Sequence, residues 1–509
     1  MSIISKRSIL LGLSALSAGV GAVPCKRTNK LQWGPCNIET GGLPVECAKL
    51  TVPLDYADQS SNKTLDLDLI KYPAQNGPSK GSILLNFGGP GQDGLNNMIA
   101  YAPIQGPITG GQHDLISWDP RGTGNTIRFA CFEPEELGAT YAQGLPDASD
   151  TGPGQVWAES TILAKSCGAT QQANGGLVGM AYTARDMIQI VDALDEDGML
   201  RYWGISGGTT LGSTVAAMFP DRVDKIILDG VMNAHEYYHA SGEVEMLSSS
   251  DETFEGFLDA CFENQEKCPL ARKFDSADAL KEGMAKFFED LKYNPIPMFT
   301  NVTVPFALDY STVNTLTLST LYRPPQYQNL SRILDGLLQA DTKPAEEILL
   351  GGGSSIPQEA EAILGIRCGD KIPRASSWQE LASTEEKFRE TSKYFPGFGR
   401  GYYVYTCAQW LFEANERYEG DFQVKTRNPL LFIGNTYDPV TPLVSAKNMS
   451  SGFEGSALLQ HNGFGHLSIT QPSNCTVAAI QNYFINGELP EPGTVCEPNA
   501  PLFANDPEI

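Results

Sequence analysis

The chain has 509 residues, with 36 lysines and arginines against 60 aspartates and glutamates, so its formal net charge is −24. Hydrophobic residues make up 41% of the sequence and charged residues 19%, which is the composition of a folded globular protein. The acidic balance argues against a protein that grips nucleic acid or an anionic membrane, because it would repel both. We expect no nucleic-acid partner and no membrane partner, and the sequence does not indicate the oligomeric state.

Residues 1–22 have the three parts of a secretory signal peptide. Lys6 and Arg7 supply the positive region, an apolar stretch runs from Ile9 to about Ala18, and residues 20–22 are small enough for cleavage. The alternative is a short amphipathic N-terminal tail. The apolar stretch is too short to span a bilayer. We therefore expect a secreted, extracellular protein.

The cysteines agree with an oxidising compartment. There are 11 in the chain, and setting aside Cys25 beside the cleavage site leaves an even number. Sequence order suggests that neighbours pair, although ten cysteines allow many other connectivities. The suggested pairs are Cys36–Cys47, Cys131–Cys167, Cys261–Cys268, Cys368–Cys407 and Cys475–Cys496. No Cys-x-x-Cys occurs, so a zinc ribbon is not indicated, and we expect no metal and no cofactor.

Five Asn-x-Ser/Thr sequons also fit a secretory route, because they are acceptors for N-glycosylation. They lie at Asn62, Asn301, Asn329, Asn448 and Asn474.

Short apolar runs that alternate with helical patterns predict an α/β fold with a mainly parallel sheet flanked by helices. Residues 65–69 alternate strictly and indicate an early, half-exposed strand, and residues 184–194 have the spacing of an amphipathic helix. The continuous runs expected to be buried strands are residues 82–87, 115–118, 201–205, 223–228 and 430–433.

The alternation stops between residues 233 and 425. Helical patterns take over there, at residues 254–262, 277–291, 327–338 and 380–392. We interpret it as a helical lid inserted between two strands of the sheet; the alternative, a separate domain on a flexible tether, is less favoured because no Pro- or Ser-rich linker flanks the region. The expected organisation is a first core part at 23–232, the lid at 233–425 and a second core part at 426–509.

The pentapeptide Gly204-Ile205-Ser206-Gly207-Gly208 matches Gly-x-Ser-x-Gly between a strand and a helix, the context of a nucleophile elbow. A serine on such a sharp turn stands clear of the sheet at a helix N-terminus. The pattern predicts Ser206 as the nucleophile; the alternative is a plain glycine-rich turn.

An activated serine needs a base and a group that orients the base. In this arrangement the chain order is Ser, acid, His, so the base must lie late in the sequence. We predict His466, in a glycine-rich loop, with His461 as the fallback. Asp438, just past the strand at 430–433, is the predicted acid, although loop aspartates often make only an Asx turn.

The oxyanion hole is predicted from two backbone N–H groups. One is that of Gly207, directly after the serine, and the other is that of Gly89, in the loop after the strand at 82–87. Glycines there let the backbone approach a substrate oxygen closely. A plain tight turn is the alternative at Gly89.

Together these segments resemble the α/β-hydrolase serine exopeptidases of the tripeptidyl aminopeptidase and proline iminopeptidase type. The resemblance covers most of residues 33–496 and matches the lid only in position and character. Phe87 stands where proline iminopeptidases usually carry His, which favours the tripeptidyl aminopeptidase branch. Gly207-Gly208 departs from the commoner Tyr-Gly, which we expect to leave room beside the nucleophile. The motifs that carry the resemblance are Gly88-Gly89-Pro90-Gly91, Asp119-Pro120-Arg121-Gly122-Thr123-Gly124, the Ser206 pentapeptide, Asp438-Pro439-Val440-Thr441-Pro442 and Gly465-His466.

A competing motif is His235-Glu236-Tyr237-Tyr238-His239, which reads as the His-Glu-x-x-His of zinc metalloproteases. The motif directly follows a sheet strand, and Gly230 and Asn233 are poor helix formers. The sequence indicates no third ligand for the metal. We favour the alternative, in which the two tyrosines pack at the base of the lid and the histidines lie near the pocket rim.

Three functions remain open. The chain is a secreted serine aminopeptidase, a hydrolase of small esters or amides with the same triad, or a non-catalytic binding protein. An aminopeptidase needs an anion in the lid for the free amine of its peptide, whereas an esterase needs only apolar walls. The candidates for that anion are Glu236, Glu243 and Glu245, with Asp251 and Glu252 nearby; the alternative is a solvated acidic surface.

Overall fold

The computed structural model describes residues 30–132, 149–299, 306–351, 357–398 and 400–504. The predicted signal peptide, Cys25 and the sequon at Asn301 lie outside the described residues.

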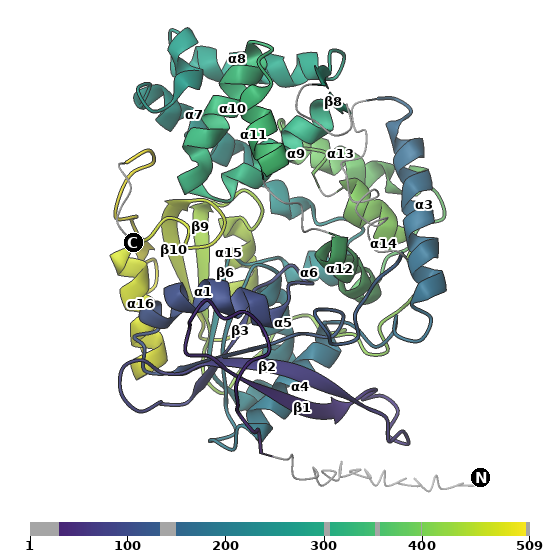
Figure 1. Cartoon of the computed structure of the whole chain (residues 1–509), viewed down its shortest axis with the longest axis vertical. Helices are drawn as coiled ribbons and strands as arrows, with labels where there is room; N and C mark the ends of the chain where they lie inside the picture. The colour runs from purple at the N-terminus through teal and green to yellow at the C-terminus, as the bar shows by residue number, and fades with distance from the viewer. Residues whose placement is uncertain (1–29, 133–148, 300–305, 352–356, 399, 505–509) are drawn as a thin grey trace, which may run out of the picture.

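A nine-stranded sheet forms the lower half of the molecule in Figure 1, in the order β1-β2-β4-β3-β5-β6-β9-β10-β11. The first two strands pair antiparallel, β2 pairs antiparallel with β4, and all the other pairs are parallel. The strands are β1 (Glu46–Pro53), β2 (Thr64–Tyr72), β3 (Ser82–Asn86), β4 (Asp114–Trp118), β5 (Leu200–Ile205), β6 (Val223–Asp229), β9 (Leu431–Tyr437), β10 (Ala457–Phe464) and β11 (Val495–Cys496).

Helices cover both faces of this sheet, as the continuous apolar strands predict. Successive side chains of a strand point to opposite faces, and β3 divides accordingly. Ile83 and Leu85 pack in one hydrophobic cluster with α1 and α16, whereas Leu84 packs in another with α4 and α5. The helices on the sheet are α1 (Gly94–Ile108), α4 (Met180–Ala193), α5 (Gly207–Met218), α15 (Leu443–Gly452) and α16 (Asn474–Asn486).

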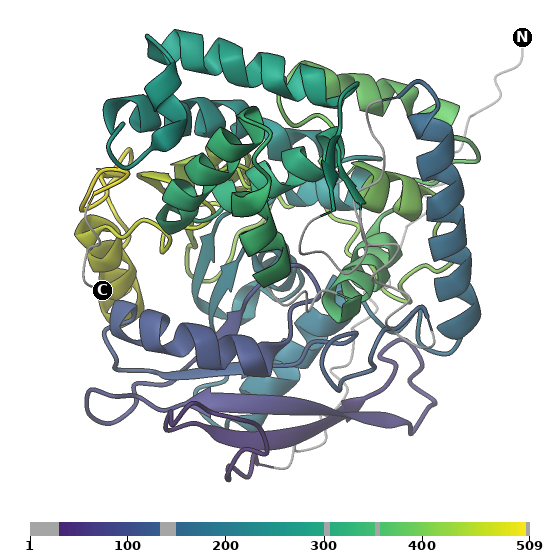
Figure 2. The ribbon, with the colours of Figure 1, turned by 45° about the horizontal axis from the view of Figure 1, so that its top comes forward.

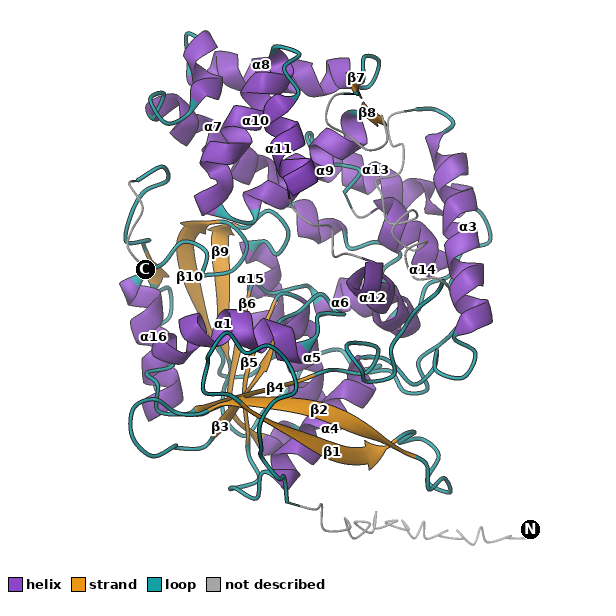
Figure 3. Ribbon diagram, viewed as in Figure 1, coloured by secondary structure: helices purple, strands orange, loops and turns teal. Residues whose placement is uncertain are grey.

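Between β6 and β9 the chain forms a mainly helical layer at the carboxyl ends of the parallel strands (Figures 1 and 3). It has its own hydrophobic core, centred on the rings of Phe254, Phe257 and Phe288. Its helices are α6 (Ala234–His239), α7 (Ser250–Glu263), α8 (Ala277–Leu291), α9 (Tyr310–Leu321), α10 (Tyr327–Leu338), α11 (Lys343–Gly351), α12 (Pro357–Asp370), α13 (Ala382–Thr391) and α14 (Thr406–Ala408), with a small hairpin of β7 (Ile296–Met298) and β8 (Phe306–Leu308). The layer also contains the short 3-10 and π turns η2 (Val244–Leu247), η3 (Pro269–Lys273), η4 (Pro324–Gln326), η5 (Trp378–Leu381) and η6 (Arg400–Tyr405), whereas η1 (Pro220–Arg222) precedes β6.

One helix that precedes β5 in the chain also packs on this layer. Helix α3 (Gly152–Thr170) stands along its side, which is clearest in Figure 2. Val156 belongs to the lid's hydrophobic core, and the Trp157 ring meets that of Tyr405 edge-on at 6.0 Å. The lid layer is therefore built from two separate stretches of the chain.

The structure joins all five cysteine pairs that sequence order suggests: Cys36–Cys47, Cys131–Cys167, Cys261–Cys268, Cys368–Cys407 and Cys475–Cys496. Within the described ranges, no helix combines the length and the apolar character needed to cross a membrane.

Candidate active site

Ser206 occupies the sharp turn between β5 and α5, with backbone angles φ 53° and ψ −123°. A non-glycine residue at positive φ is strained. The flanking glycines make the turn possible: a β-carbon at Gly204 would lie 2.3 Å from the carbonyl oxygen of Gly208, and one at Gly208 would lie 2.7 Å from that of Asn86. The Gly-x-Ser-x-Gly pattern is therefore a packing requirement of the turn.

The loop after β3 lies directly against this turn. A β-carbon at Gly207 would lie 2.6 Å from the carbonyl carbon of Gly89, and one at Gly88 would lie 2.9 Å from the Gly207 nitrogen. The expectation that Gly207 leaves room beside the nucleophile is therefore wrong, because the backbone of Gly89 fills that space. The two predicted oxyanion donors, Gly89 and Gly207, stand next to each other beside Ser206, at the positive end of the α5 dipole.

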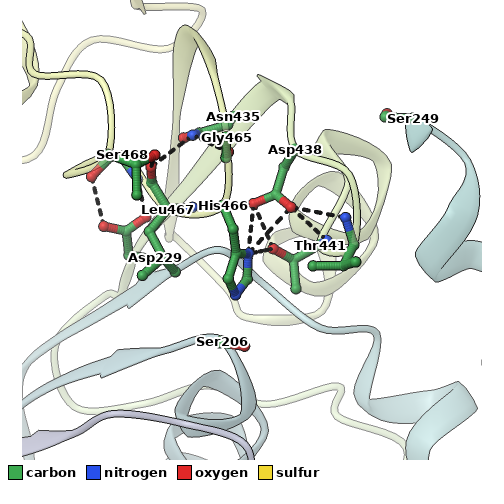
Figure 4. Close-up of polar contacts among 12 residues, drawn as sticks. Ser206, Asp229, Ser249, Asn435, Asp438, Thr441, Gly465, His466, Leu467 and Ser468 are labelled. Carbon is green, nitrogen blue, oxygen red and sulfur yellow. Dashed lines mark hydrogen bonds and ion pairs between the residues drawn. The ribbon is translucent and has the colours of Figure 1, made fainter. Parts of the chain in front are cut away.

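The predicted acid and base are in contact. Nδ1 of His466 lies 3.2 and 3.0 Å from the two carboxylate oxygens of Asp438, which is fully buried. The Thr441 hydroxyl donates to the same carboxylate at 2.7 Å and lies 3.0 Å from Nδ1. The other imidazole nitrogen points toward Ser206 (Figure 4). The structure thus brings Ser206, His466 and Asp438 together in the order that a serine hydrolase uses.

Asp438 also makes the Asx turn that is the alternative interpretation of a loop aspartate. Its Oδ1 accepts the backbone N–H groups of Val440 (3.0 Å) and Thr441 (2.9 Å). The turn and the contact with His466 coexist, because a carboxylate has acceptor sites for both. The local turn fixes the orientation of the group that faces the imidazole.

The lid also contacts the predicted base. The backbone N–H of His466 donates to the carbonyl of Tyr322 at 2.9 Å, and the Tyr322 ring meets the imidazole edge-on at 4.8 Å. The fallback base, His461, lies elsewhere. It is buried, its Nδ1 lies 2.9 Å from the Thr476 hydroxyl on α16, and burial lowers its pKa to about 4.

Ser206 opens into a cleft of about 90 Å³ between the sheet and the lid. Its walls combine apolar side chains, among them Met232, Met246 and Phe398, with polar and charged ones, among them Asn233, Glu236 and Arg367. The lining residues are Gly89, Ser206, Met232, Asn233, Glu236, Glu243, Met246, Tyr322, Arg367, Phe398, Tyr403, Val440, Thr441 and Ser445.

Of the acidic lid residues, Glu243 is already paired. Its carboxylate forms ion pairs with Arg367 and with Lys371, the latter at 3.1 Å, and all three side chains are buried. These two cations hold the pKa of Glu243 down at about 2 despite the effect of burial. The prediction that Glu243 binds a substrate amine is not supported, because its carboxylate already forms ion pairs with Arg367 and Lys371.

Glu236 is the acid that faces the cleft without such a partner. Its Oε2 accepts the backbone N–H of Glu245 at 3.0 Å, and it forms no ion pair with any described residue. Burial, with the charges of Glu245 and Glu243, raises the pKa of Glu236 to about 7. A positive ligand group beside it would favour the carboxylate form.

The remaining acids do not line the cleft. Glu245 accepts hydrogen bonds from Asn233, Ser445 and Asn448. Asp251 accepts the Ser392 hydroxyl at 2.7 Å and Glu252 is exposed on α7. The exposure of Glu252 agrees with the alternative of a solvated acidic surface, whereas Glu245 and Asp251 are half-buried.

The His-Glu-x-x-His segment forms a short helix, α6, although Gly230 and Asn233 before it are poor helix formers. Asn233 caps it by accepting the N–H groups of His235 and Glu236. Tyr237 and Tyr238 are fully buried, His235 meets the Phe422 ring edge-on at 5.3 Å, and His239 is exposed. Among the described residues no group of three or more His, Cys, Asp or Glu side chains could hold a metal ion.

Four of the five sequons fall on described residues. Asn62, Asn448 and Asn474 are exposed, and Asn329 on α10 is half-buried.

Comparison with known proteins gives the class. Residues 82–294 match the family model described as alpha/beta hydrolase fold, and residues 395–496 match the one described as TAP-like protein. The two matches contain Ser206 and the Asp438–His466 pair respectively. With the sheet topology and the serine turn, they place the chain among the α/β-hydrolase enzymes.

Within that class the chain is similar to two proteins named as peptidases and to one named as a carboxylesterase. It is 25% identical to serine protease Hip1 of Mycobacterium tuberculosis over 482 residues, which cover 92% of this chain and 91% of that one. It is 24% identical to tripeptidyl aminopeptidase of Streptomyces lividans over 515 residues, covering 96% and 90%. Carboxylesterase B of M. tuberculosis is 26% identical over 470 residues, covering 89% and 86%.

Sequence reasoning missed several residues that shape the site. Arg367 and Lys371, which neutralise Glu243, come from α12 and the residue after it, more than a hundred positions away. Asp229 ends β6 and binds Ser468, two residues past the predicted base. The Asp229-Gly230 pair at a strand end was a visible signal, whereas no local pattern marks Arg367.

Proposed function

We propose that the protein is a secreted serine aminopeptidase that releases short peptides or single residues from free N-termini through an acyl-enzyme on Ser206. The observation that carries the proposal is that Glu236, an acid without a cationic partner among the described residues, lines the same cleft as Ser206.

In the first half-reaction the Ser206 hydroxyl attacks the scissile carbonyl and its proton passes to the free nitrogen of His466. The carbonyl oxygen becomes an oxyanion, which the N–H groups of Gly89 and Gly207 stabilise. Asp438 holds the imidazole by Nδ1 and stabilises the imidazolium. His466 then returns the proton to the leaving amine as the C–N bond breaks, which leaves the N-terminal fragment esterified to Ser206.

In the second half-reaction water attacks the ester carbonyl while His466 accepts one of its protons. The same two N–H groups stabilise the second oxyanion. The C–O bond to Ser206 breaks, the serine recovers its proton from His466, and the fragment leaves as a carboxylic acid.

Glu236 is the proposed receptor for the substrate's ammonium group. An ammonium in a partly buried cleft is costly unless an anion meets it. Glu236 supplies that anion, and Glu243 does not, because Arg367 and Lys371 already neutralise it. The distance from Ser206 to Glu236 then sets how many residues fit before the scissile bond.

Two relatives carry names that agree with the proposal, tripeptidyl aminopeptidase and serine protease Hip1. A third, named carboxylesterase B, favours the second candidate function, hydrolysis of small esters or amides by the same three residues. The apolar walls from Met232, Met246, Phe398 and Val440 suit that function as well.

The test compares one short peptide chromogenic substrate with its N-acetylated form. An aminopeptidase hydrolyses the free-amine substrate at least about 100-fold better in kcat/KM, since the acetyl group removes a charge worth several kcal/mol in a desolvated site. Equal rates on the two substrates would contradict the aminopeptidase proposal and leave the ester or amide hydrolase.

Secretion and glycosylation are part of the proposal. Five disulfides support an oxidising compartment. The exposure of Asn62, Asn448 and Asn474 suits glycan attachment. Mass spectrometry of the protein secreted by a eukaryotic host, before and after enzymatic deglycosylation, tests both points.

A further inference from the structure

Asp229, the last residue of β6, contacts both halves of the catalytic arrangement. Its backbone carbonyl accepts the N–H of Ser206 at 3.0 Å. Its carboxylate accepts the backbone N–H of Ser468 at 3.1 Å and the Ser468 hydroxyl at 2.6 Å. Figure 4 shows this second carboxylate on the far side of the His466 loop from Asp438. One buried residue therefore links the nucleophile turn to the loop of the base.

We propose that Asp229 is a second, indirect acid of the site: it positions His466 through Ser468, and its negative charge stabilises the imidazolium that forms during catalysis. The inference rests on the proposed function, in which His466 is the base.

The loop of the base needs such support because its backbone is strained. Leu467 has φ 82°, a left-handed conformation that non-glycine residues rarely adopt, and Gly465 before His466 has φ 90°. The Asn435 amide donates to the carbonyls of both residues at 2.9 Å, and Asp438 accepts the Leu467 N–H at 3.3 Å. Asp229 accepts two hydrogen bonds from the next residue, Ser468, so hydrogen bonds fix the loop on both sides of the imidazole.

The charge of Asp229 is the part that a purely structural role does not require. A neutral amide could bind both Ser468 groups, its oxygen accepting the N–H and its nitrogen donating to the hydroxyl, yet a fully buried carboxyl stands there without an ion pair of its own among the described residues. Burial raises the pKa of Asp229 to about 6, the charge of His466 lowers it and that of Asp438 raises it. Three other groups around His466 are neutral near pH 7: the Asn435 amide, the Thr441 hydroxyl and the Tyr322 phenol, whose pKa burial raises. Because its pKa lies below neutral pH, we expect Asp229 to be ionised at pH 7 and to act on His466 together with Asp438.

The test measures how fast a small fluorophosphonate labels Ser206 as a function of pH. This rate needs the deprotonated base but no particular substrate, so its midpoint reports the pKa of His466 even if the aminopeptidase proposal fails. In Asp229→Asn, which keeps an acceptor for Ser468, we expect the midpoint to move down by about 0.5–1 pH unit, because a nearby negative charge is lost. The labelling rate at high pH should fall about 3–10-fold as the base weakens.

A midpoint equal to that of the unmodified protein would overturn the inference. Asp119→Asn is the matched control, since burial also raises the pKa of Asp119 to about 6 while its carboxylate accepts the N–H groups of Gly94, Leu95 and Asn125 and none from the loop of His466, and its midpoint should not move. Absence of any label on Ser206 in the unmodified protein would instead contradict the proposed function itself.

If Asp229→Asn does not fold, Ser468 provides a second comparison. Ser468→Ala removes one bond to the carboxylate and should slow labelling several-fold, while Ser468→Thr keeps the hydroxyl and should restore it. Equal labelling by Ser468→Ala and the unmodified protein would also contradict the inference.

Discussion

Gly207 and Gly89 meet without space for a side chain: a β-carbon on Gly207 would lie 2.6 Å from the carbonyl carbon of Gly89. The residue after the nucleophile is thus locked against the loop that supplies the second predicted oxyanion donor. A bulkier residue at 207 would have to push the loop after β3 away from Ser206.

Gly207→Ala should therefore disrupt the oxyanion hole. Losing one donor costs about 100–1000-fold in kcat in other hydrolases, and a displaced loop would weaken both donors. We expect kcat to fall by at least that factor while KM changes less. Gly154→Ala on α3 is the control, because a β-carbon there meets no atom within 4 Å. Full activity in Gly207→Ala would show that the loop does not carry the oxyanion.

Asp438→Asn tests the orientation of the base. The amide could still accept one N–H of the turn, but it would present a donor or a weaker acceptor to Nδ1 of His466 and favour the wrong tautomer. We expect kcat to fall by about 10³–10⁴-fold with the fold retained, as steady-state kinetics and circular dichroism would show. A loss below 10-fold would move the acid role to another carboxylate.

Glu243→Gln tests the buried ion cluster of the lid. The change leaves Arg367 and Lys371 without their anion, which should cost about 3–5 kcal/mol at pH 7. Since the pKa of Glu243 is lowered to about 2, its contribution is present above about pH 4.5 and is lost as the pH falls toward 2. The stability difference between variant and unmodified protein should shrink over that window in denaturant unfolding. A stability difference that does not change with pH would contradict the ion pairing of Glu243 with Arg367 and Lys371.

Glu236→Gln tests the proposed amine receptor. We expect KM for a free-amine peptide to rise about 10–100-fold while hydrolysis of the acetylated peptide is unchanged, because only the first loses its counter-charge. With a pKa of about 7 in the free protein, Glu236 should also make kcat/KM for the free-amine peptide fall below neutral pH. Glu252→Gln on the exposed face of α7 is the matched control. Equal losses on both peptides would indicate a structural role.

Much of the fold could be predicted from the sequence because its signals are local. Apolar runs bounded by turns mark β3, β5 and β6, and Gly204 is required by a contact within its own turn, since a β-carbon there would meet the carbonyl oxygen of Gly208. The sequence also predicts the lid, since its helices carry amphipathic patterns that sheet strands lack.

The remaining features depend on contacts between distant segments. Nothing near Glu243 in the sequence indicates that Arg367 forms an ion pair with it. Likewise, nothing in the sequence around α3 indicates that this helix packs on the lid and not on the sheet. The expectation of free space beside Gly207 is wrong for the same reason, because a loop more than a hundred residues earlier in the sequence fills that space. Local patterns predict the candidate triad, and tertiary packing decides which charged side chains are free of an ion pair.

The most direct test of the account is to identify the residue that a fluorophosphonate modifies. We expect peptide mapping by mass spectrometry to find one adduct, on Ser206, with loss of activity in proportion to labelling and no adduct in Ser206→Ala. An adduct on another serine, or activity that survives complete labelling of Ser206 and is lost to a metal chelator, would contradict the account and return attention to His235 and His239.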